Sequence, residues 1–372
     1  MSTRKEHAGV CPEASPPPLR CRAILIMAGG TGGHIFPALA VADILREQGW
    51  QVTWLGAPDS MEADLVPKHG YAMAMVRFSG LRGKGLLRKL MLPLNLAVAL
   101  WQSAVAIFSH RPDVVLGMGG YITFPGGLMS ALLRRPLVIH EQNSVAGLSN
   151  KVLARVASRV LSGFPDVLPK AQWCGNPVRA AIAALADPQQ RYGARSGRLK
   201  VLVVGGSLGA KAINEAVPQA LADLPESMRP DVVHQTGKQH YAAVQALYQQ
   251  AGVQADICAF IDDMAASYAS ADLVICRSGA LTVAELAAAG AASVLIPFPF
   301  AVDDHQTHNA RFLSERGAAV LLPQTELSAE RLAQLLRELD REKLMVMAQR
   351  ARGLSREDAA EAVAYVCREL AE

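Results

Sequence analysis

A short apolar run that ends in a glycine cluster constrains this chain more than any other feature. The run Ala23–Met27 has the length of a buried strand and leads into Gly29–His34, where four of the first five residues are glycine. The helix-length run Ile35–Leu45 follows. Glycines allow a sharp turn and leave backbone N–H groups free at the positive end of the following helix. We therefore predict a strand, a turn and a helix that together bind an anion or a sugar hydroxyl.

This glycine cluster matches neither standard nucleotide-binding fingerprint. A dinucleotide-binding loop needs a third glycine where Ile35 stands, and a Walker A loop ends in Gly-Lys-Ser or Gly-Lys-Thr. The cluster therefore indicates a less common kind of ligand.

The same arrangement returns in the second half of the chain, where Val201–Val204 runs into Gly205–Ala210. Strand-like runs alternate with helix-length segments in both halves, which predicts an α/β fold. We expect two Rossmann-like open parallel-sheet domains that face a cleft, with ligands beyond the carboxyl ends of the strands. The other predicted strands are Gln51–Leu55, Ala72–Val76, Val114–Gly117, Leu137–Ile139, Val160–Leu161, Val232–His234, Ala255–Ala259, Leu273–Ile275, Val294–Ile296 and Ala319–Leu321.

The domain boundaries follow from composition and turn signals. Residues 1–20 are polar and proline-rich, which predicts a disordered extension, and they lack the apolar run of a secretory signal. The turn Gly175-Asn176-Pro177 is the expected boundary between the domains. We predict an N-terminal domain over 21–177, a C-terminal domain over 178–355, and a helix in 356–372 that can pack back on the N-terminal domain.

Charge and cysteine content exclude several classes of protein. A net charge of +4 and a pI near 8.7 are too mild for a strongly cationic nucleic-acid-binding protein, so we expect no nucleic-acid partner. The six cysteines form no C-x-x-C pair and no cluster with histidine. This pattern favours reduced thiols without a structural zinc.

Two further polar motifs of the first half stand at predicted strand ends. The cluster Gly117–Tyr121 repeats the opening arrangement, and His140–Asn143 places four polar side chains directly after an apolar strand. A tight turn and a solvated loop are the structural alternatives. We favour ligand contacts because both motifs lie where parallel sheets bind their ligands.

The second half offers a competing interpretation. Gly205–Gly209 matches the G-x-S-x-G turn of serine hydrolases, with Ser207 as the nucleophile. The alternative is a phosphate-binding loop at a helix N-terminus. The hydrolase interpretation leaves both glycine loops of the first half unused, which counts against it. Its acid and histidine would come from Asp303, Asp304, His305 and His308.

The segment Arg277–Glu285 has the same strand-to-helix position. Its Ser-Gly turn and Thr282 suit a helix cap, with Glu285 in the first turn. In the functional alternative, the Glu285 carboxylate accepts both hydrogen bonds of a ribose diol while nearby amides meet phosphate. The polar group Asp303–Gln306 has no third cluster to complete a metal site, so we expect no metal.

Together these motifs resemble the MurG family, the peptidoglycan N-acetylglucosaminyltransferases that convert lipid I to lipid II. The likeness extends over nearly the whole chain beyond residue 20, in order, and includes Ile35–Ala40 and Gly175–Arg179. It implies a GT-B enzyme that inverts the anomeric carbon, needs no cofactor, and has UDP-N-acetylglucosamine (UDP-GlcNAc) and undecaprenyl-linked lipid I as partners. Two alternatives to this transferase function remain: the serine hydrolase and a non-catalytic nucleotide-sugar-binding protein.

The resemblance also implies roles for individual residues. Glu285 and its helix would hold ribose and diphosphate, Ile261 would contact uracil through its backbone, and Gln306 would contact the sugar. His34 is the best candidate for the general base because a neutral imidazole works near pH 7, although it can equally serve only to orient substrate; Glu141 is the other candidate. The implied donor contacts are Thr31, Gly32, Gly33, Asn143, Arg179, Ser207, Ile261, Ala280, Leu281, Thr282, Val283, Ala284, Glu285 and Gln306. The implied acceptor side is His34, Gly119, Gly120, Tyr121 and Glu141.

One departure from the family pattern and one segment bear on the acceptor. Phe124 follows Thr123 where the family usually has a Ser-Gly pair, which we expect to reshape the acceptor loop. The segment Leu81–Leu92 is basic and leads into an apolar run through Phe108, which predicts a buried helix with an interfacial lead-in. A core helix with a solvated positive end is the alternative. We expect the chain at the cytoplasmic face of the bacterial inner membrane, bound peripherally to anionic lipid through Arg82, Lys84, Arg88 and Lys89.

Overall fold

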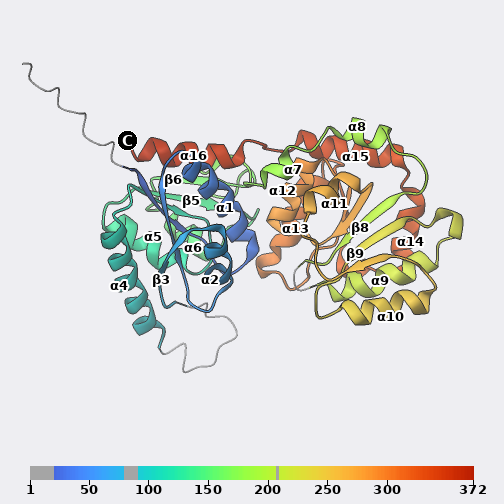
Figure 1. The fold of residues 1–372 in the computed structure, drawn as a ribbon, viewed down its shortest axis with the longest axis horizontal. Coiled ribbons are helices and arrows are strands. Elements are labelled where there is room, and N and C mark those ends of the chain that lie inside the picture. Colours follow the sequence, from blue (N-terminus) through green and yellow to red (C-terminus); the bar gives the residue numbers. More distant parts are fainter. Residues whose placement is uncertain (1–20, 79–90, 207–208) are drawn as a thin grey trace, which may run out of the picture.

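The computed structural model describes residues 21–78, 91–206 and 209–372. These residues form two parallel sheets side by side, each flanked by helices (Figure 1). The first sheet has the order β3-β2-β1-β4-β5-β6-β7 and the second has the order β10-β9-β8-β11-β12-β13. The first sheet consists of β1 (Ala23–Met27), β2 (Gln51–Gly56), β3 (Ala72–Met75), β4 (Val114–Gly117), β5 (Leu137–Glu141), β6 (Arg159–Ser162) and β7 (Gln172–Trp173). The second consists of β8 (Lys200–Val204), β9 (Asp231–Gln235), β10 (Asp256–Cys258), β11 (Leu273–Cys276), β12 (Ser293–Leu295) and β13 (Val320–Leu321).

Helices cover both faces of the first sheet, which confirms the predicted α/β class. On one face, α1 (Gly32–Glu47) packs on β1 and β2, and on the other α4 (Leu92–His110) and α5 (Thr123–Leu132) pack on β1, β4 and β5. Buried positions such as Ile24 and Ile26 face α1, whereas Leu25 and Met27 face α4 and α5. The remaining helical segments of this domain are α2 (Met61–Leu65), η1 (Val66–His69) and α6 (Leu148–Leu153).

The second sheet is covered in the same way. One face carries α9 (Lys211–Ala222), α10 (Tyr241–Ala251) and α14 (Ala329–Glu338), and the other carries α11 (Met264–Ser270), α12 (Ala280–Ala289) and α13 (His305–Ser314). The remaining segments are α7 (Ala180–Ala183), α8 (Pro188–Gly193), α15 (Arg341–Gly353), α16 (Ala359–Leu370), η2 (Glu226–Met228), η3 (Val302–Asp304) and η4 (Gln324–Glu326).

Every strand predicted from the sequence is present, with ends that differ by at most two residues. The two-residue edge strand β7 was missed because a run of this length has no periodicity to detect. The predicted extension over 1–20 and the basic residues Arg82, Lys84, Arg88 and Lys89 lie outside the described residues.

The prediction of a buried helix after the basic segment is wrong in one respect. α4 is long and apolar enough to cross a membrane by length and composition, yet only 22% of its most apolar window is buried. Ala99, Ala106 and Ile107 pack into the domain core, whereas Trp101 and Phe108 are exposed. One face of α4 therefore belongs to the core and the opposite face is apolar and uncovered.

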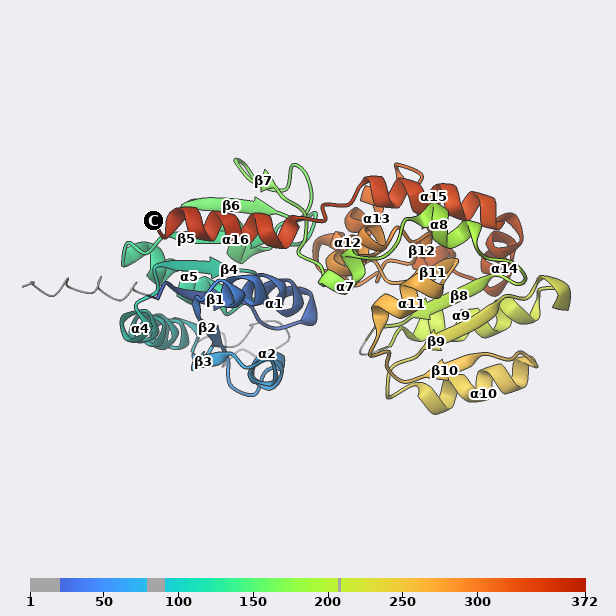
Figure 2. The ribbon, with the colours of Figure 1, turned by 45° about the horizontal axis from the view of Figure 1, so that its top comes forward.

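The last helix, α16, lies on the N-terminal domain. Figure 2 shows the chain crossing from α15 of the C-terminal domain to α16, which runs beside α1. Val363, Ala364 and Cys367 of α16 are fully buried in the same core as Ile35 and Leu45 of α1. The N-terminal core is therefore completed by residues that follow the whole C-terminal domain.

Replacement of Val363 by alanine is expected to destabilise the N-terminal domain by roughly 2 kcal/mol, because it removes two buried methyl groups and leaves a cavity. Denaturant unfolding followed by fluorescence measures this loss. Tyr365→Ala on the exposed face of the same helix is the matched control, since Tyr365 is 59% exposed. Equal losses in the two variants would contradict this packing.

Candidate active site

In each sheet, the order of the strands reverses direction at a strand that is followed by a glycine loop. β1 lies beside β4 in the first sheet, and β8 lies beside β11 in the second. In open parallel sheets, ligands bind beyond the carboxyl ends of the strands at such a point. α1 follows β1 directly and α12 follows β11, and these two helices contact each other across the domain boundary. Two ligand-binding edges therefore meet at one place.

Polar contacts also join the domains at this place. Asn309 of α13 is fully buried, and its Oδ1 accepts hydrogen bonds from the backbone N–H and the hydroxyl of Ser144, at 2.9 and 2.7 Å. Its Nδ2 donates to Oδ1 of Asn143 and to the carbonyl of Ser278. The loop after β5, with the predicted donor contact Asn143, is thereby held against the C-terminal domain.

The two glycine loops of the N-terminal domain touch each other. Gly120 has a φ of +87°, and a Cβ at this position would overlap the carbonyl oxygen of Gly29. The backbone N–H of Gly29 donates to the carbonyl of Gly119, at 3.4 Å. Glycine at 120 is therefore required both by conformation and by space, which explains why both loops are glycine-rich.

Gly120→Ala is expected to lower turnover at least tenfold, for two reasons. The new methyl group pushes the two loops apart, and alanine at a positive φ adds a backbone strain of about 1–2 kcal/mol. Gly49→Ala is the matched control. Gly49 has a φ of +83° but open space around its Cβ position, so it reports the strain alone. Steady-state assays measure the turnover of both variants. Equal losses of turnover in Gly120→Ala and Gly49→Ala would contradict the close approach of the loops.

A carboxylate that was not singled out from the sequence holds the opening loop. Glu62 of α2 is fully buried; its Oε2 accepts from the backbone N–H of Gly30 at 3.1 Å, and its Oε1 accepts from that of Ala57 at 3.3 Å. The phenol of Tyr121 is partly buried, and burial together with the charge of Glu62 raises the pKa of Tyr121. Tyr121 therefore stays protonated at neutral pH and can donate a hydrogen bond.

His34 stands in the first turn of α1, half-buried, with one ring nitrogen engaged. Its Nδ1 lies 2.8 Å from Oε1 of Gln142. Nε2 of Gln142 lies 3.0 Å from Nδ1 of His140, and Nε2 of His140 lies 2.8 Å from the carbonyl oxygen of Gly175. His140 is fully buried, and burial lowers its pKa to about 4. Of this row, only His34 was given an individual role from the sequence; His140 and Gln142 were predicted only as part of the segment His140–Asn143, for which ligand contacts were favoured.

Glu141, the other predicted base, is almost fully buried, and each of its two carboxylate oxygens accepts two hydrogen bonds. Oε1 accepts from the backbone and side-chain amides of Asn143, and Oε2 accepts from the backbone N–H of Gly147 and from Nδ2 of Asn150, at 3.0 and 2.9 Å. A carboxylate with four donors holds its loop and has little capacity left for a substrate proton. The geometry therefore favours His34 over Glu141 as the base.

On the C-terminal side, Glu285 is paired with Arg179. Nε and Nη2 of Arg179 both donate to Oε1 of Glu285, at 3.2 and 2.8 Å, and the hydroxyl of Tyr268 donates to Oε2 at 3.3 Å. Burial raises the pKa of Glu285, and Arg179 opposes this shift. The prediction that Glu285 lies in the first turn of its helix is wrong, because α12 begins at Ala280 and its N-cap is Gly279. Glu285 therefore does not cap the helix, and its carboxylate is held by Arg179 and Tyr268.

The other predicted donor contacts surround this helix start. No described side chain caps α12, so the backbone N–H groups of its first turn lack a side-chain partner and can meet an anion. Gln306 lies in the first turn of α13 and accepts from the backbone N–H of Phe298, and Ile261 is half-buried in the loop after β10. Ser207 lies outside the described residues. The first turn of α12 contains Ala280, Leu281 and Thr282, with Val283 and Ala284 in the next turn.

The proposed acid and histidine of a hydrolase are engaged locally. His305 Nδ1 lies 2.7 Å from the carbonyl of Val302, and Asp304 accepts from the hydroxyl of Thr307. Neither contact forms the histidine–carboxylate pair that a hydrolase needs. The hydrolase alternative has no support from these residues.

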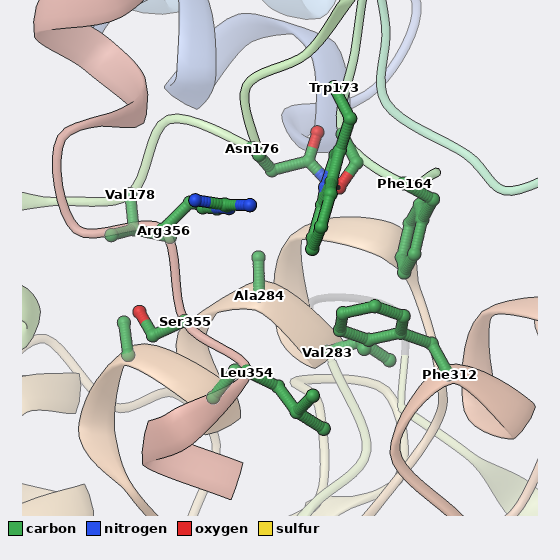
Figure 3. Close-up of a pocket in the computed structure, with 14 residues that line it drawn as sticks. Phe164, Trp173, Asn176, Val178, Val283, Ala284, Phe312, Leu354, Ser355 and Arg356 are labelled. Carbon is green, nitrogen blue, oxygen red and sulfur yellow. Dashed lines mark hydrogen bonds between the residues drawn. The ribbon is translucent and has the colours of Figure 1, made fainter. Parts of the chain in front are cut away.

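A separate pocket lies where the two connections between the domains cross. Figure 3 shows Trp173, Asn176, Phe312 and Arg356 around it, with the Arg356 guanidinium 4.2 Å from the centre of a Trp173 ring. Nδ2 of Asn176 donates to the backbone carbonyl of Gln142 at 3.0 Å. The pocket therefore backs onto the loop that holds His34.

Phe124, which we expected to reshape the acceptor loop, lies in the first turn of α5. Its side chain packs against the core of the N-terminal domain beside α4.

Two facing Rossmann-like domains with glycine loops at both switch points define the chain as a GT-B glycosyltransferase. Residues 24–162 match the glycosyltransferase family 28 N-terminal domain, and residues 200–364 match the glycosyltransferase family 28 C-terminal domain. The chain belongs to glycosyltransferase family 28.

Relatives and solved structures agree. The chain is 63% identical over 350 residues to a protein of Aromatoleum aromaticum, covering 94% of this chain and 98% of that one; the relative is named UDP-N-acetylglucosamine–N-acetylmuramyl-(pentapeptide) pyrophosphoryl-undecaprenol N-acetylglucosamine transferase. A protein of Azoarcus with the same name is 63% identical over 351 residues. The crystal structure of MurG from Acinetobacter baumannii superposes with a TM-score of 0.83 at 42% identity, covering 94% of this chain and 99% of that one.

Proposed function

We propose that this protein transfers N-acetylglucosamine from UDP-GlcNAc to the N-acetylmuramyl group of lipid I, giving lipid II for peptidoglycan synthesis. The proposal rests on the 63% sequence identity, over 350 residues, to a relative that is named as such a transferase. It also rests on the two parallel sheets of the molecule, each of which has a ligand-binding edge. A single-site hydrolase or binding module would need only one of these edges.

The donor is held mainly by the C-terminal domain in this proposal. The Glu285 carboxylate accepts from the ribose hydroxyls, the first turn of α12 meets the diphosphate, and Arg179 adds positive charge beside it. Ser207, Ile261 and Gln306 contribute contacts to the phosphate, the uracil and the sugar. From the facing domain, Thr31, Gly32, Gly33 and Asn143 reach the donor.

The chemistry in this proposal needs a base for the acceptor hydroxyl and stabilisation for the departing UDP. His34 takes the proton, and the acceptor oxygen attacks the anomeric carbon from the face opposite the phosphate, so the configuration inverts. The helix N-terminus and Arg179 stabilise the charge that develops on UDP, without a metal or other cofactor. Gly119, Gly120 and Tyr121 line the side from which the acceptor arrives.

UDP release from UDP-GlcNAc, measured with and without a lipid I analogue, tests the proposal. A transferase releases UDP rapidly only when the acceptor is present. Rapid release without acceptor would favour a hydrolase, and no release under either condition would favour a binding module. Addition of a chelator is expected to leave the rate unchanged.

We further propose that α4 places the enzyme on the cytoplasmic surface of the bacterial inner membrane. Leu94, Val98, Trp101, Val105 and Phe108 recur at helical spacing along its exposed face. Trp101 is 68% exposed and Phe108 63%, which is unusual for a helix that packs on a soluble core. The basic residues Arg82, Lys84, Arg88 and Lys89 precede this face in the chain and would add attraction to anionic lipid.

Trp101→Glu is expected to lower binding to anionic vesicles by roughly tenfold, because an exposed indole that would enter the lipid interface is replaced by a negative charge. Sedimentation with phosphatidylglycerol-containing vesicles measures the bound fraction. Met228→Glu is the control, since Met228 is exposed on the C-terminal domain. Binding that is equally reduced in both variants, or unchanged in Trp101→Glu, would contradict the membrane-facing role of α4.

A further inference from the structure

A row of three hydrogen bonds runs from the boundary between the domains to His34. It joins the carbonyl of Gly175, the ring of His140, the amide of Gln142 and Nδ1 of His34, with donor–acceptor distances of 2.8, 3.0 and 2.8 Å. His34 and Gln142 are 108 positions apart in the chain. The direction of each bond follows from the groups at its ends.

The first bond has one possible direction. A carbonyl oxygen only accepts, so Nε2 of His140 carries a hydrogen and donates to Gly175. His140 is fully buried and its lowered pKa keeps it neutral at pH 7. Because a neutral imidazole has one N–H, Nδ1 of His140 is an acceptor.

The amide of Gln142 is oriented by two acceptors. Its Nε2 lies 3.0 Å from Nδ1 of His140 and 3.1 Å from the backbone carbonyl oxygen of His140. The reverse orientation would place the amide oxygen against both of these acceptors, which is unfavourable. Oε1 of Gln142 therefore faces His34, and because Oε1 only accepts, Nδ1 of His34 donates.

We propose that His140 and Gln142 are positioning residues that hold His34 as the Nδ1–H tautomer, which leaves the lone pair of Nε2 for the proton of the acceptor hydroxyl. Nε2 of His34 has no hydrogen bond to any described residue. The acceptor oxygen forms its bond to the anomeric carbon as its proton moves to Nε2. The bond from the anomeric carbon to the phosphate oxygen breaks, and its electron pair leaves with UDP. This inference rests on the proposed transferase function.

The surrounding backbone leaves room for this arrangement. A Cβ at Gly119 would lie 2.7 Å from Nδ1 of His34 and 3.1 Å from Oε1 of Gln142. The side-chain amide of Asn176 donates a hydrogen bond to the backbone carbonyl of Gln142 and so holds the Gln142 backbone. The glycine loop after β4 therefore has a second role, which is to let the imidazole and the amide meet.

Nitrogen-15 NMR of the full chain with labelled histidine reads the tautomer directly, without substrate. The His34 signals are assigned by their loss in His34→Gln. We expect a protonated Nδ1 and an unprotonated Nε2 at neutral pH. A protonated Nε2 in the neutral form would overturn the proposal.

Gln142→Leu is expected to give a mixed tautomer and to lower kcat by about tenfold or more, with KM for UDP-GlcNAc within twofold. The expected loss is smaller than the roughly 10⁴-fold seen when a catalytic histidine is forced into the wrong tautomer, because the ring is released and not reversed. Gln142→Glu keeps an acceptor for Nδ1–H but turns a second oxygen toward the two acceptors of His140, so it should not recover the turnover. Unchanged tautomer and kcat in Gln142→Leu would refute the positioning role.

Ser130→Ala is the control for loss of a buried hydrogen bond in the same domain, because the Ser130 hydroxyl bonds only within α5, to the carbonyl of Gly126. It should change neither the tautomer nor kcat. The outcomes also separate this inference from the proposed function. Nδ1–H without transfer to lipid I would refute the function alone, and transfer with a protonated Nε2 would refute the inference alone.

Discussion

Replacement of His34 by alanine is expected to lower kcat by roughly 10²–10⁴-fold, the usual contribution of a positioned general base, while the Kd for UDP-GlcNAc changes less than threefold. Nε2 of His34, at the edge where the two domains meet, has no hydrogen bond to residues 21–78, 91–206 or 209–372, whereas Glu141 is occupied by four donors. Removal of the imidazole therefore affects the transition state far more than the bound donor.

Initial rates at saturating donor, together with calorimetric titration of UDP-GlcNAc, separate these two effects. His69→Ala is the control, because His69 is an exposed histidine in η1 of the same domain. A loss of donor affinity as large as the loss of kcat would mean that His34 only binds the substrate.

Glu285→Ala is expected to weaken donor binding by roughly 10²-fold, with a smaller effect on kcat. Hydrogen bonds to a charged group contribute about 1.5–3 kcal/mol each, and a ribose diol makes two of them. The variant also leaves the guanidinium of Arg179 without its partner at 2.8 Å.

The 2′-deoxyribose analogue of UDP-GlcNAc distinguishes the ribose contact from a general weakening of the site. The unaltered protein should bind the analogue at least tenfold more weakly than the natural donor, and Glu285→Ala should bind both equally. Discrimination that persists unchanged in the variant would place the ribose contact on another residue. Glu226→Ala, in the exposed segment η2, is the control for loss of a surface carboxylate.

Local signals in the sequence were sufficient for the strands and for the positions of the glycine loops. Period, length and turn residues act over a few positions, so Ala23–Met27 and Val201–Val204 with their following glycines were predictable. They also placed His34 and Glu285 at strand ends, because parallel strands bring their carboxyl ends to one edge.

Contacts between distant segments were not predictable in this way. Glu62 meets Gly30 across 32 positions, and Asn309 meets Ser144 across 165, and neither residue has a local pattern that marks it. The exposed face of α4 was likewise misjudged as buried, since composition alone does not tell which side of an apolar helix faces the core.

The role of Glu141 illustrates the same limit. Residue type and position made it the second candidate base after His34, and only its four hydrogen-bond donors identify it as the group that holds the loop of Gln142 and Asn143. The distinction between a base and a structural carboxylate depends on unoccupied lone pairs, which the sequence does not encode locally.

Analysis of the lipid product tests the central claim most directly. The protein is incubated with UDP-GlcNAc and lipid I, and the lipid is examined by mass spectrometry and by NMR of the new glycosidic bond. We predict a lipid heavier by one N-acetylhexosamine residue, joined through the inverted anomeric carbon. Unmodified lipid I with free N-acetylglucosamine in solution, or a product that retains the donor's configuration, would contradict the account.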